Sequence, residues 1–431
     1  MTLRGEVVRI GVLGCGNVGA SLVKLIADRA DAIEARTGLR LEVAAVAVRN
    51  MSRERGVDLP DGVITRDAHA VAADPTIDIV VEVIGGIEPA RELIAIAMAN
   101  GKPVITANKE LLANVGTELF GLADDAGVDL LFEAAVAGGI PLIRALRESL
   151  RGEPIRRVMG IVNGTTNFIL TKMTEEGADY GVALAEAQAL GFAERDPTAD
   201  VEGFDAAAKA AIIATVAFGV KVVAGDVYHE GISQVTAHDI AVARRLGYVV
   251  KLLGIAERMP ATGEIAVRVH PAMVPVTHPL ASVRESYNAV FVEGDAVGSL
   301  MFYGRGAGGM PTASAVLGDV IDAAVNLSKG THGSLGTFGR ALTLPIDETT
   351  AEYLLSLEVA DRPGVLHSVT GVFARNGVSI RAAEQEGIAP DARLVFITHE
   401  AKESAVQATM RELRELDVVR SVGGLLRVIG S

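Results

Sequence analysis

Residues 7–20 read VVRIGVLGCGNVGA and decide the fold of the first domain. An apolar, β-branched run is followed by three glycines in G-x-G-x-x-G spacing and then by a helical pattern. Gly14 permits a tight turn, Gly16 lets a pyrophosphate approach the backbone, and Gly19 allows close packing of the helix. The helix N-terminus favours the phosphates. The stretch therefore predicts a dinucleotide-binding site; the alternative is a merely structural turn.

The sequence on either side of this stretch alternates strands with helices. β-branched runs and helical periods follow one another over the first third of the chain, as in βαβ units around a parallel sheet. One predicted helix, residues 89–100, is stopped by Gly101 and Pro103. We expect a Rossmann domain at residues 1–138, completed by part of residues 301–328. Its predicted strands cover residues 7–13, 41–48, 78–84, 103–106 and 128–132.

Beyond residue 138 the pattern changes. Helices, the loop VNGTTNF and longer β-branched runs no longer alternate strictly, which indicates a second, α+β domain over residues 139–300. Residues 329–350 are rich in Gly, Thr and Ser and are predicted to be a linker. Residues 351–431 read strand, helix, strand, strand, helix, strand, the order of a small ferredoxin-like domain. The predicted fold class is therefore α/β in three domains.

The composition excludes several classes of protein. The chain has 431 residues, and its 54 acidic against 40 basic residues give a net charge of −14, which argues against a nucleic-acid or membrane-surface partner. The single cysteine, Cys15, excludes a disulfide framework and fits a reducing compartment. We expect a cytoplasmic protein without a signal peptide, and no apolar run reaches the roughly 20 residues of a membrane span.

The residues near the glycine turn also indicate the chemistry and the cofactor. A dehydrogenase that forms a thioester needs a cysteine in its substrate domain, and Cys15 lies in the turn instead, which favours interconversion of alcohol and carbonyl or of amine and imine. Arg49 ends the second predicted strand, where an arginine can accept a 2′-phosphate. Arg53 and Arg55 could share this role, or Arg49 could be simply solvated. NADP(H) is therefore favoured and NAD(H) stays possible.

A second informative stretch, residues 190–211, reads LGFAERDPTADVEGFDAAAKAA. Lys209 stands in an apolar segment that continues as IIATVAFGV, the signature of a buried helix. Burial would lower the pKa of a lysine and suit it to exchange a proton with an alcohol. Asp205, four residues earlier, is its natural partner; the alternative is an ordinary surface ion pair.

Other charged residues form candidate contacts around this lysine. Glu194 and Asp200 lie in a loop with Gly and Pro, where acids either cap turns or hold a substrate ammonium group. Asp196 precedes a proline and is predicted to form a turn. Lys109 follows the strand 103–106 at its carboxyl end, where open parallel sheets bind ligands, so we expect it near the nicotinamide.

Taken together, these motifs closely resemble the homoserine dehydrogenase family. Residues 187–209, AQALGFAERDPTADVEGFDAAAK, match the family signature, and the resemblance extends to GVLGCGNVG, TANKELL, EAAVAGGIPLI, VNGTTNFILTKM and GRGAGGMPTASAVLGD. It implies reversible reduction of L-aspartate 4-semialdehyde to L-homoserine with NAD(P)H, a step towards threonine, methionine and isoleucine. It also implies that the domain at residues 139–300 binds the substrate and forms the dimer.

The resemblance also implies roles for single residues. Lys209 becomes the proton donor with Asp205 beside it, and Glu194, Asp200 and Gly191 become the substrate contacts. The segment EAAVAGGI implies a site for sodium or potassium, bound largely by carbonyl oxygens. Its ligands would be Glu133, Val136, Gly138 and Ile140. The expected cofactor residues are Gly14, Gly16, Asn17, Val18, Gly19, Arg49, Thr106, Lys109, Gly191 and Gly306.

The C-terminal module resembles an ACT domain through DRPGVL at residues 361–366 and NGVSI at residues 376–380. Such domains bind small amino acids at paired interfaces, which implies feedback by threonine and a homodimer or homotetramer. Gly364 and Asn376 are candidate effector contacts, with ordinary turn chemistry as the alternative.

Three other interpretations account for parts of the sequence. Another ACT-linked dehydrogenase, such as one acting on 3-phosphoglycerate, usually places its glycine turn mid-chain and relies on a histidine and an acid. A non-catalytic amino-acid sensor on a Rossmann scaffold would not need the lysines and acids singled out above. A fusion with aspartate kinase is not expected, because the predicted domains leave no length for a kinase.

Overall fold

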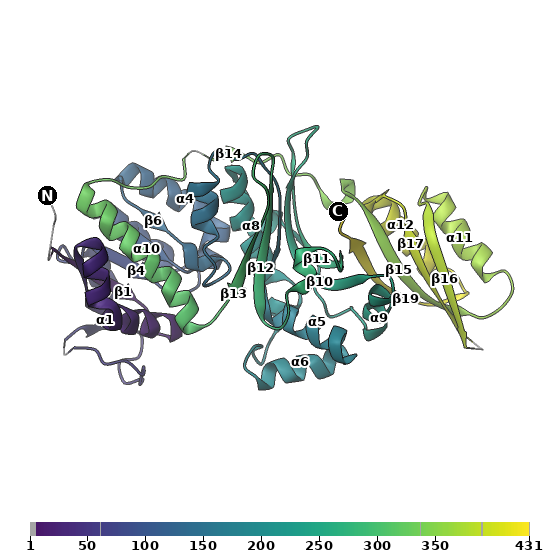
Figure 1. The fold of residues 1–431 in the computed structure, drawn as a ribbon, viewed down its shortest axis with the longest axis horizontal. Helices are drawn as coiled ribbons and strands as arrows, with labels where there is room; N and C mark the ends of the chain where they lie inside the picture. Colours follow the sequence, from purple (N-terminus) through teal and green to yellow (C-terminus); the bar gives the residue numbers. More distant parts are fainter. Residues whose placement is uncertain (1–5, 61, 337, 389–390, 431) are drawn as a thin grey trace. The chain divides into compact units, whose positions relative to one another are not determined.

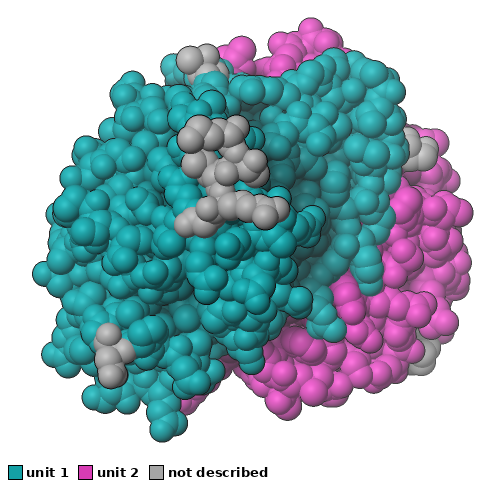
Figure 2. Space-filling model, turned by 60° about the vertical axis from the view of Figure 1, so that its left-hand side comes forward, with its two compact units in different colours: residues 1–158, 208–226, 288–341 teal, residues 159–207, 227–287, 342–431 magenta. Residues whose placement is uncertain are grey.

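The computed structural model describes residues 6–60, 62–336, 338–388 and 391–430; parts of the predicted domains at 1–5, 61, 337, 389–390 and 431 lie outside them. The chain divides into two units (Figure 2). Unit 1 comprises residues 1–158, 208–226 and 288–341, and unit 2 comprises residues 159–207, 227–287 and 342–431. The boundary falls inside strand β7 (Ile155–Ile161) and helix α8 (Phe204–Phe218).

Unit 1 is built on a six-stranded sheet. Its order is β3-β2-β1-β4-β5-β6 with parallel neighbours throughout, which is the doubly wound order of a Rossmann domain. The predicted fold class is confirmed, and each of the five predicted strands is present within a few residues. The strands are β1 (Glu6–Leu13), β2 (Leu39–Ala47), β3 (Ile64–Thr65), β4 (Ile79–Glu82), β5 (Val104–Thr106) and β6 (Leu130–Leu131).

Helices cover this sheet with apolar residues spaced three or four positions apart. Leu22 and Ile26 of α1 share one core with Ile10 of β1, and Val316 and Val320 of α10 join it from far along the chain (Figure 1). Among the described residues, no helix is both long and apolar enough to cross a bilayer. The helices are α1 (Asn17–Thr37), α2 (Ala68–Ala73), α3 (Ala90–Ala99), α4 (Lys109–Ala126) and α10 (Gly309–Lys329).

The remaining elements of unit 1 are short, apart from one pair of strands. Strands β12 (Tyr287–Gly294) and β13 (Gly298–Arg305) pair with each other. The predicted linker 329–350 contains some regular structure, because its strand β14 (Gly339–Arg340) pairs with β8 (Val220–Lys221). Single turns of helix are η1 (Glu133–Ala135), η2 (Ala145–Ser149) and η3 (Ala224–Asp226).

The first part of unit 2 combines helices with a long antiparallel pair, β10 (Tyr248–Arg258) and β11 (Ile265–Pro275). Strand β9 (Tyr228–His229) runs parallel to β11. This mixture is the α+β pattern expected for the middle of the chain. The other elements are α5 (Gly164–Glu176), α6 (Tyr180–Ala189), α7 (Thr198–Val201), α9 (Ala237–Arg245) and η4 (Pro279–Ser282).

The C-terminal part of unit 2 contains four antiparallel strands in the order β19-β15-β17-β16, which confirms the ferredoxin-like prediction. Strand β19 also pairs with β11, so these strands continue the sheet of the first part of unit 2. Tyr353, Leu355 and Leu357 alternate along β15 and pack with residues of α11 and α12 in one core. Figure 1 shows these two helices beside the sheet. The elements are η5 (Ile346–Glu348), β15 (Thr350–Ala360), α11 (Val365–Arg375), β16 (Ile380–Ile388), β17 (Asp391–Thr398), β18 (Ala401–Lys402), α12 (Glu403–Arg414) and β19 (Val419–Val428).

Candidate active site

The glycine turn after β1 has the geometry that the sequence predicts. Gly14 has a φ of 103°, a left-handed conformation that favours glycine. A Cβ atom on Gly19 would lie 2.3 Å from the carbonyl oxygen of Gly14, so only glycine lets α1 pack on the turn. A Cβ on Gly16 would meet no protein atom within 4 Å, so protein packing does not explain this glycine. Its role fits the predicted approach of a pyrophosphate.

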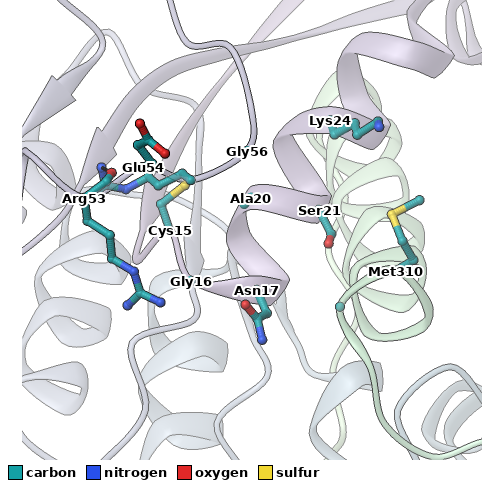
Figure 3. A pocket seen from close by; sticks show the side chains of 12 residues that line it. Cys15, Gly16, Asn17, Ala20, Ser21, Lys24, Arg53, Glu54, Gly56 and Met310 are labelled. Carbon is teal, nitrogen blue, oxygen red and sulfur yellow. Dashed lines mark hydrogen bonds between the residues drawn. The ribbon is translucent and has the colours of Figure 1, made fainter.

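A cavity of about 400 Å³ lies in front of this turn. No side chain caps the first turn of α1, so its backbone N–H groups are available to an anion. Figure 3 shows Asn17, Ser21 and Lys24 along the helix, with Arg53 and Glu54 on the other side of the turn. These residues fit a dinucleotide.

The arginines after β2 differ in their position. Arg53 and Arg55 line the cavity, whereas Arg49 is exposed and is not among its lining residues. The guanidinium of Arg55 donates to backbone carbonyls of its own loop, including that of Arg53 at 2.5 Å. Among the three, Arg53 is therefore the strongest candidate for a 2′-phosphate contact, a choice that the strand-end position of Arg49 did not indicate.

Cys15 is buried beside the same cavity. Burial raises the pKa of its thiol, and the nearby Arg55 only partly opposes this effect. A protonated thiol is a weak nucleophile. The structure thus gives Cys15 the packing role expected of a small residue in the turn.

A second cavity in unit 1, of about 280 Å³, brings together residues predicted from distant parts of the sequence. Lys109 and Lys209 both line it, together with Gly138 and Gly306. Lys109 is the first residue of α4, and Asn108 caps that helix by accepting a hydrogen bond from the Leu111 backbone at 3.1 Å. The cap therefore fixes where α4 begins and, with it, the backbone position of Lys109.

A buried carboxylate that was not predicted from the sequence links the ends of two neighbouring strands, β4 and β5. Glu82, at the end of β4, is fully buried and accepts a hydrogen bond from the Thr106 hydroxyl at 2.6 Å. Its other oxygen accepts from the backbone N–H groups of Ile84 at 2.7 Å and Gly85 at 3.2 Å. Glu82 thus holds the side chain of Thr106, the last residue of β5, in place. An acid within the apolar run VVEVIGG was the available signal.

Lys209 is less buried than the apolar sequence of its helix predicts. Most of α8 is buried, as its apolar sequence indicates, but the Lys209 side chain is only partly buried. It lines the 280 Å³ cavity. In this position its ammonium group keeps access to water or to a polar ligand, which avoids the cost of burying a charge. A position on a cavity wall is also what contact with a substrate requires.

In unit 2, one asparagine joins two of the predicted acids. The Nδ2 of Asn163 donates to Oδ1 of Asp200 at 2.7 Å and to Oδ2 of Asp205 at 2.9 Å. Its Oδ1 caps α5 by accepting from Thr166 N at 2.9 Å. Asp205 is buried and Asp200 is half-buried. Asn163 therefore holds both carboxylates at a set spacing, a role that its place in VNGTTNF did not reveal.

Glu194 and Asp196 of this stretch are exposed. Glu194 and Gly191 lie at the surface of unit 2, and Gly191 has a φ of 76°. Asp196 accepts hydrogen bonds from the backbone and hydroxyl of Thr198, at 3.2 and 2.7 Å. This is the turn predicted for Asp196.

The expected cation loop in unit 1 begins at a buried carboxylate. Glu133 accepts hydrogen bonds from the backbone N–H groups of Ile143 at 2.8 Å and Arg144 at 2.7 Å. Burial raises the pKa of Glu133 in spite of these bonds, so a cation nearby would stabilise its charged form. Within the described residues, no three His, Cys, Asp or Glu side chains gather as a metal site.

The backbone of the same loop is sharply folded. Ala137 and Gly138 follow one another with φ values of 58° and 55°. Such a conformation is costly for alanine, so the surrounding structure must enforce it. Val136 and Ile140 are buried on either side. A carboxylate and a folded run of carbonyl groups fit a monovalent cation.

The two effector candidates lie at opposite ends of α11. Gly364 begins the helix with a φ of 91°, and Asn376 ends it. The Asn376 side chain donates to the Val372 carbonyl and to the Glu412 carboxylate, both at 3.0 Å. Both residues thus have a local role in the module.

Models of known protein families match most of the chain. Residues 14–133 match the NAD-binding domain of homoserine dehydrogenase, residues 141–321 match homoserine dehydrogenase and residues 353–418 match the ACT domain. The homoserine dehydrogenase of Corynebacterium glutamicum is 49% identical over 98% of this chain and 96% of its own length. That of Bacillus subtilis is 43% identical over 99% of each chain.

Solved structures of similar proteins lead to the same group. A homoserine dehydrogenase from Thiobacillus denitrificans superposes with a TM-score of 0.93 at 42% identity, covering 99% of both chains. A hyperthermophilic archaeal homoserine dehydrogenase in complex with NADPH has a TM-score of 0.63 at 30% identity, over 74% of this chain and 98% of its own.

Proposed function

The chain belongs to the homoserine dehydrogenase family, and from this premise we propose that Lys209 exchanges the proton with the substrate oxygen. The enzyme is an oxidoreductase acting on CH–OH groups that interconverts L-aspartate 4-semialdehyde and L-homoserine with a nicotinamide cofactor. When bound, the nicotinamide supplies the hydride. Reduction of the carbonyl forms an alkoxide, and a nearby ammonium group stabilises it and donates a proton.

One observation carries this proposal: Lys109 and Lys209 line the same cavity of unit 1. Lys109 is the first residue of α4, directly after the carboxyl end of the sheet, and Lys209 belongs to α8. One carboxylate, Glu110, also lines the cavity, but the two ammonium groups outnumber it and favour developing negative charge on oxygen. Lys209 is the donor of the two, because α8 also carries Asp205 one helical turn before it.

The carboxylates of unit 2 suit the amino group of the substrate. Asp200 and Asp205 are held by one asparagine, and two carboxylates on one polar bridge form a strong contact for an ammonium group. Glu194, which is exposed and lies a few residues earlier in the chain, is the third acid proposed to contact the substrate. These acids are proposed to bind the amino group of the substrate.

The cofactor is proposed to be NADP(H) with Arg53 as the 2′-phosphate contact. We expect Arg53→Ala to raise the KM for NADPH about tenfold and to leave the KM for NADH nearly unchanged, because only NADPH carries the extra phosphate. Steady-state rates with both cofactors measure this. Arg49→Ala is the matched control, since Arg49 lies outside the cavity. A loss with Arg49→Ala but not with Arg53→Ala would reassign the contact.

The cation proposal names Glu133 with the carbonyls of Val136, Gly138 and Ile140 as ligands of sodium or potassium. The buried carboxylate and the folded loop support it. Bound there, the ion would neutralise Glu133 and stiffen the loop whose Gly138 lines the lysine cavity. Activity that is equal in potassium chloride and in tetramethylammonium chloride would contradict the proposal that a cation binds at Glu133.

Threonine is proposed as a feedback effector through the ACT domain. We expect threonine to lower the rate of the full-length enzyme, and we expect Asn376→Ala to weaken that effect, because its amide lies at the helix end of the module. Initial rates over a threonine series measure both. A full-length enzyme that is indifferent to threonine would contradict the proposal.

Assembly, pathway and location stay predictions. They are a homodimer or homotetramer, a step towards threonine, methionine and isoleucine, and a cytoplasmic location. Sedimentation, the growth requirements of cells without the enzyme and cell fractionation test them in turn.

A further inference from the structure

A buried cluster of charged groups surrounds Arg427 in unit 2. The Arg427 side chain, in β19, is 3% exposed. Its guanidinium donates to both carboxylate oxygens of Glu403, at 2.8 and 2.6 Å, and to both of Glu230, at 2.9 and 2.7 Å. Two bidentate contacts fix the guanidinium from two sides. Its backbone is held as well, because Arg427 pairs with Ala272 of β11.

The two carboxylates belong to different parts of unit 2. Glu403 begins α12 of the ACT module, is 1% exposed and also accepts a hydrogen bond from the Tyr353 hydroxyl at 2.9 Å. Burial alone would raise the pKa of Glu403, but Arg427 overcomes this and holds the pKa below its ordinary value. Glu230 lies outside the module, directly after β9, and accepts a hydrogen bond from Tyr228. Arg427 therefore connects the module to the segment after β9.

That segment supports the turn at residues 201–203 through close backbone contacts. The N–H of Ile232 donates to the Val201 carbonyl at 2.8 Å. A Cβ on Gly231 would lie 2.3 Å from the same carbonyl oxygen, and a Cβ on Gly203 would lie 3.2 Å from the Glu230 carbonyl oxygen. The Glu202 backbone and carboxylate also lie beside Gly231, so the two segments are in close contact here. A shift of the Glu230 backbone is therefore passed directly to the turn.

We propose that Arg427 is a positioning residue for the substrate, acting through Glu230 on this turn. The turn lies between Asp200 of α7 and Asp205 of α8, the two carboxylates that Asn163 bridges. The inference rests on the proposed role of these acids in binding the substrate amino group. Their spacing must match one ammonium group, so a loosened turn weakens substrate binding. None of these contacts involves the glycine turn that binds the cofactor.

The test replaces Glu230 in the full-length enzyme and compares two Michaelis constants. We expect Glu230→Ala to raise the KM for homoserine about tenfold and to leave the KM for the nicotinamide cofactor within about twofold of wild type. Glu230→Gln keeps an oxygen that accepts from Arg427, so its effect should be about threefold. The matched control is Arg393→Ala, which removes an exposed ion pair with Glu358 in the same module and should change neither constant.

Asp200→Asn, measured in parallel, separates this inference from the function on which it rests. If Asp200→Asn leaves the KM for homoserine unchanged, the proposed role of the acids is wrong and the positioning role falls with it. If Asp200→Asn raises that KM and the folded Glu230 variants do not, only the positioning role is overturned. Thermal unfolding identifies folded variants, and Glu230→Gln decides alone if Glu230→Ala does not fold.

A double variant tests whether Glu230 acts through the acids. If it does, Glu230→Ala should add little to the KM of Asp200→Asn, because the contact that it positions is already weakened. Effects that multiply would show independent damage to unit 2 and would overturn the proposal.

Discussion

Replacement of Lys209 by alanine should lower kcat by about 10²–10⁴-fold, the usual contribution of a positioned proton donor. The KM for the nicotinamide cofactor should change little, because the glycine turn and the 400 Å³ cavity do not include Lys209. Single-turnover hydride transfer and cofactor fluorescence measure the two effects separately. The loss arises because the alkoxide would have to be protonated by water instead of by a group on the cavity wall.

Two further variants make this test specific. Lys209→Arg keeps a positive charge but holds its proton too tightly to donate it near neutral pH, so it should recover little of the lost rate. Lys221→Ala removes an exposed lysine of β8 soon after the same helix and should have no effect. Near-normal turnover of Lys209→Ala would show that another group donates the proton, and Lys109 would be the next candidate.

Two glycines of the cofactor turn should separate binding from stability. A Cβ on Gly19 would stand 2.3 Å from the Gly14 carbonyl oxygen, so Gly19→Ala must displace either the turn or α1. We expect it to lower the free energy of unfolding by about 1–3 kcal/mol, the usual cost of overpacking, and to abolish detectable cofactor binding. Denaturant unfolding and cofactor titration measure this.

Gly16→Ala should weaken cofactor binding without lowering the stability of the protein. Its Cβ meets no protein atom within 4 Å and its φ of −85° suits any residue, so the free energy of unfolding should be nearly unchanged. Cofactor affinity should still fall by at least about tenfold, because a methyl group would occupy the place of closest approach to the phosphates. Gly121→Ala, in α4 with open space at its Cβ, is the control. Unchanged affinity in Gly16→Ala would place the pyrophosphate elsewhere.

Local patterns in the sequence predicted much of the fold. The alternation of apolar runs and helical periods predicted the strands of the first sheet, since side-chain period and glycine turns act over a few residues. The short strand β3 was missed, because two residues are too few to show a period. The ferredoxin-like fold of the C-terminal module also followed from pattern alone, through the order of strands and helices along the chain.

The candidate site was predicted in part. Lys109 and Lys209 were named from a strand end and an apolar helix, and the structure places both on one cavity. The residues that hold the site in place were not named: Glu82 beneath Thr106, and Asn163 between the two acids. Their partners lie 24 to 42 positions away in the chain, and no local pattern records such contacts.

The sequence alone predicted the chemistry that we propose for this protein: a glycine turn that binds a dinucleotide, a lysine that exchanges a proton, acids that bind an amino group and no cysteine suited to a thioester. These follow from residue types at short spacing. The packed structure was needed to show that Arg53 rather than Arg49 lines the cavity in front of the glycine turn, that Lys209 is partly exposed and that Arg427 reaches Glu230. Each of these depends on burial and on contacts between distant segments, which exist only once the chain has packed.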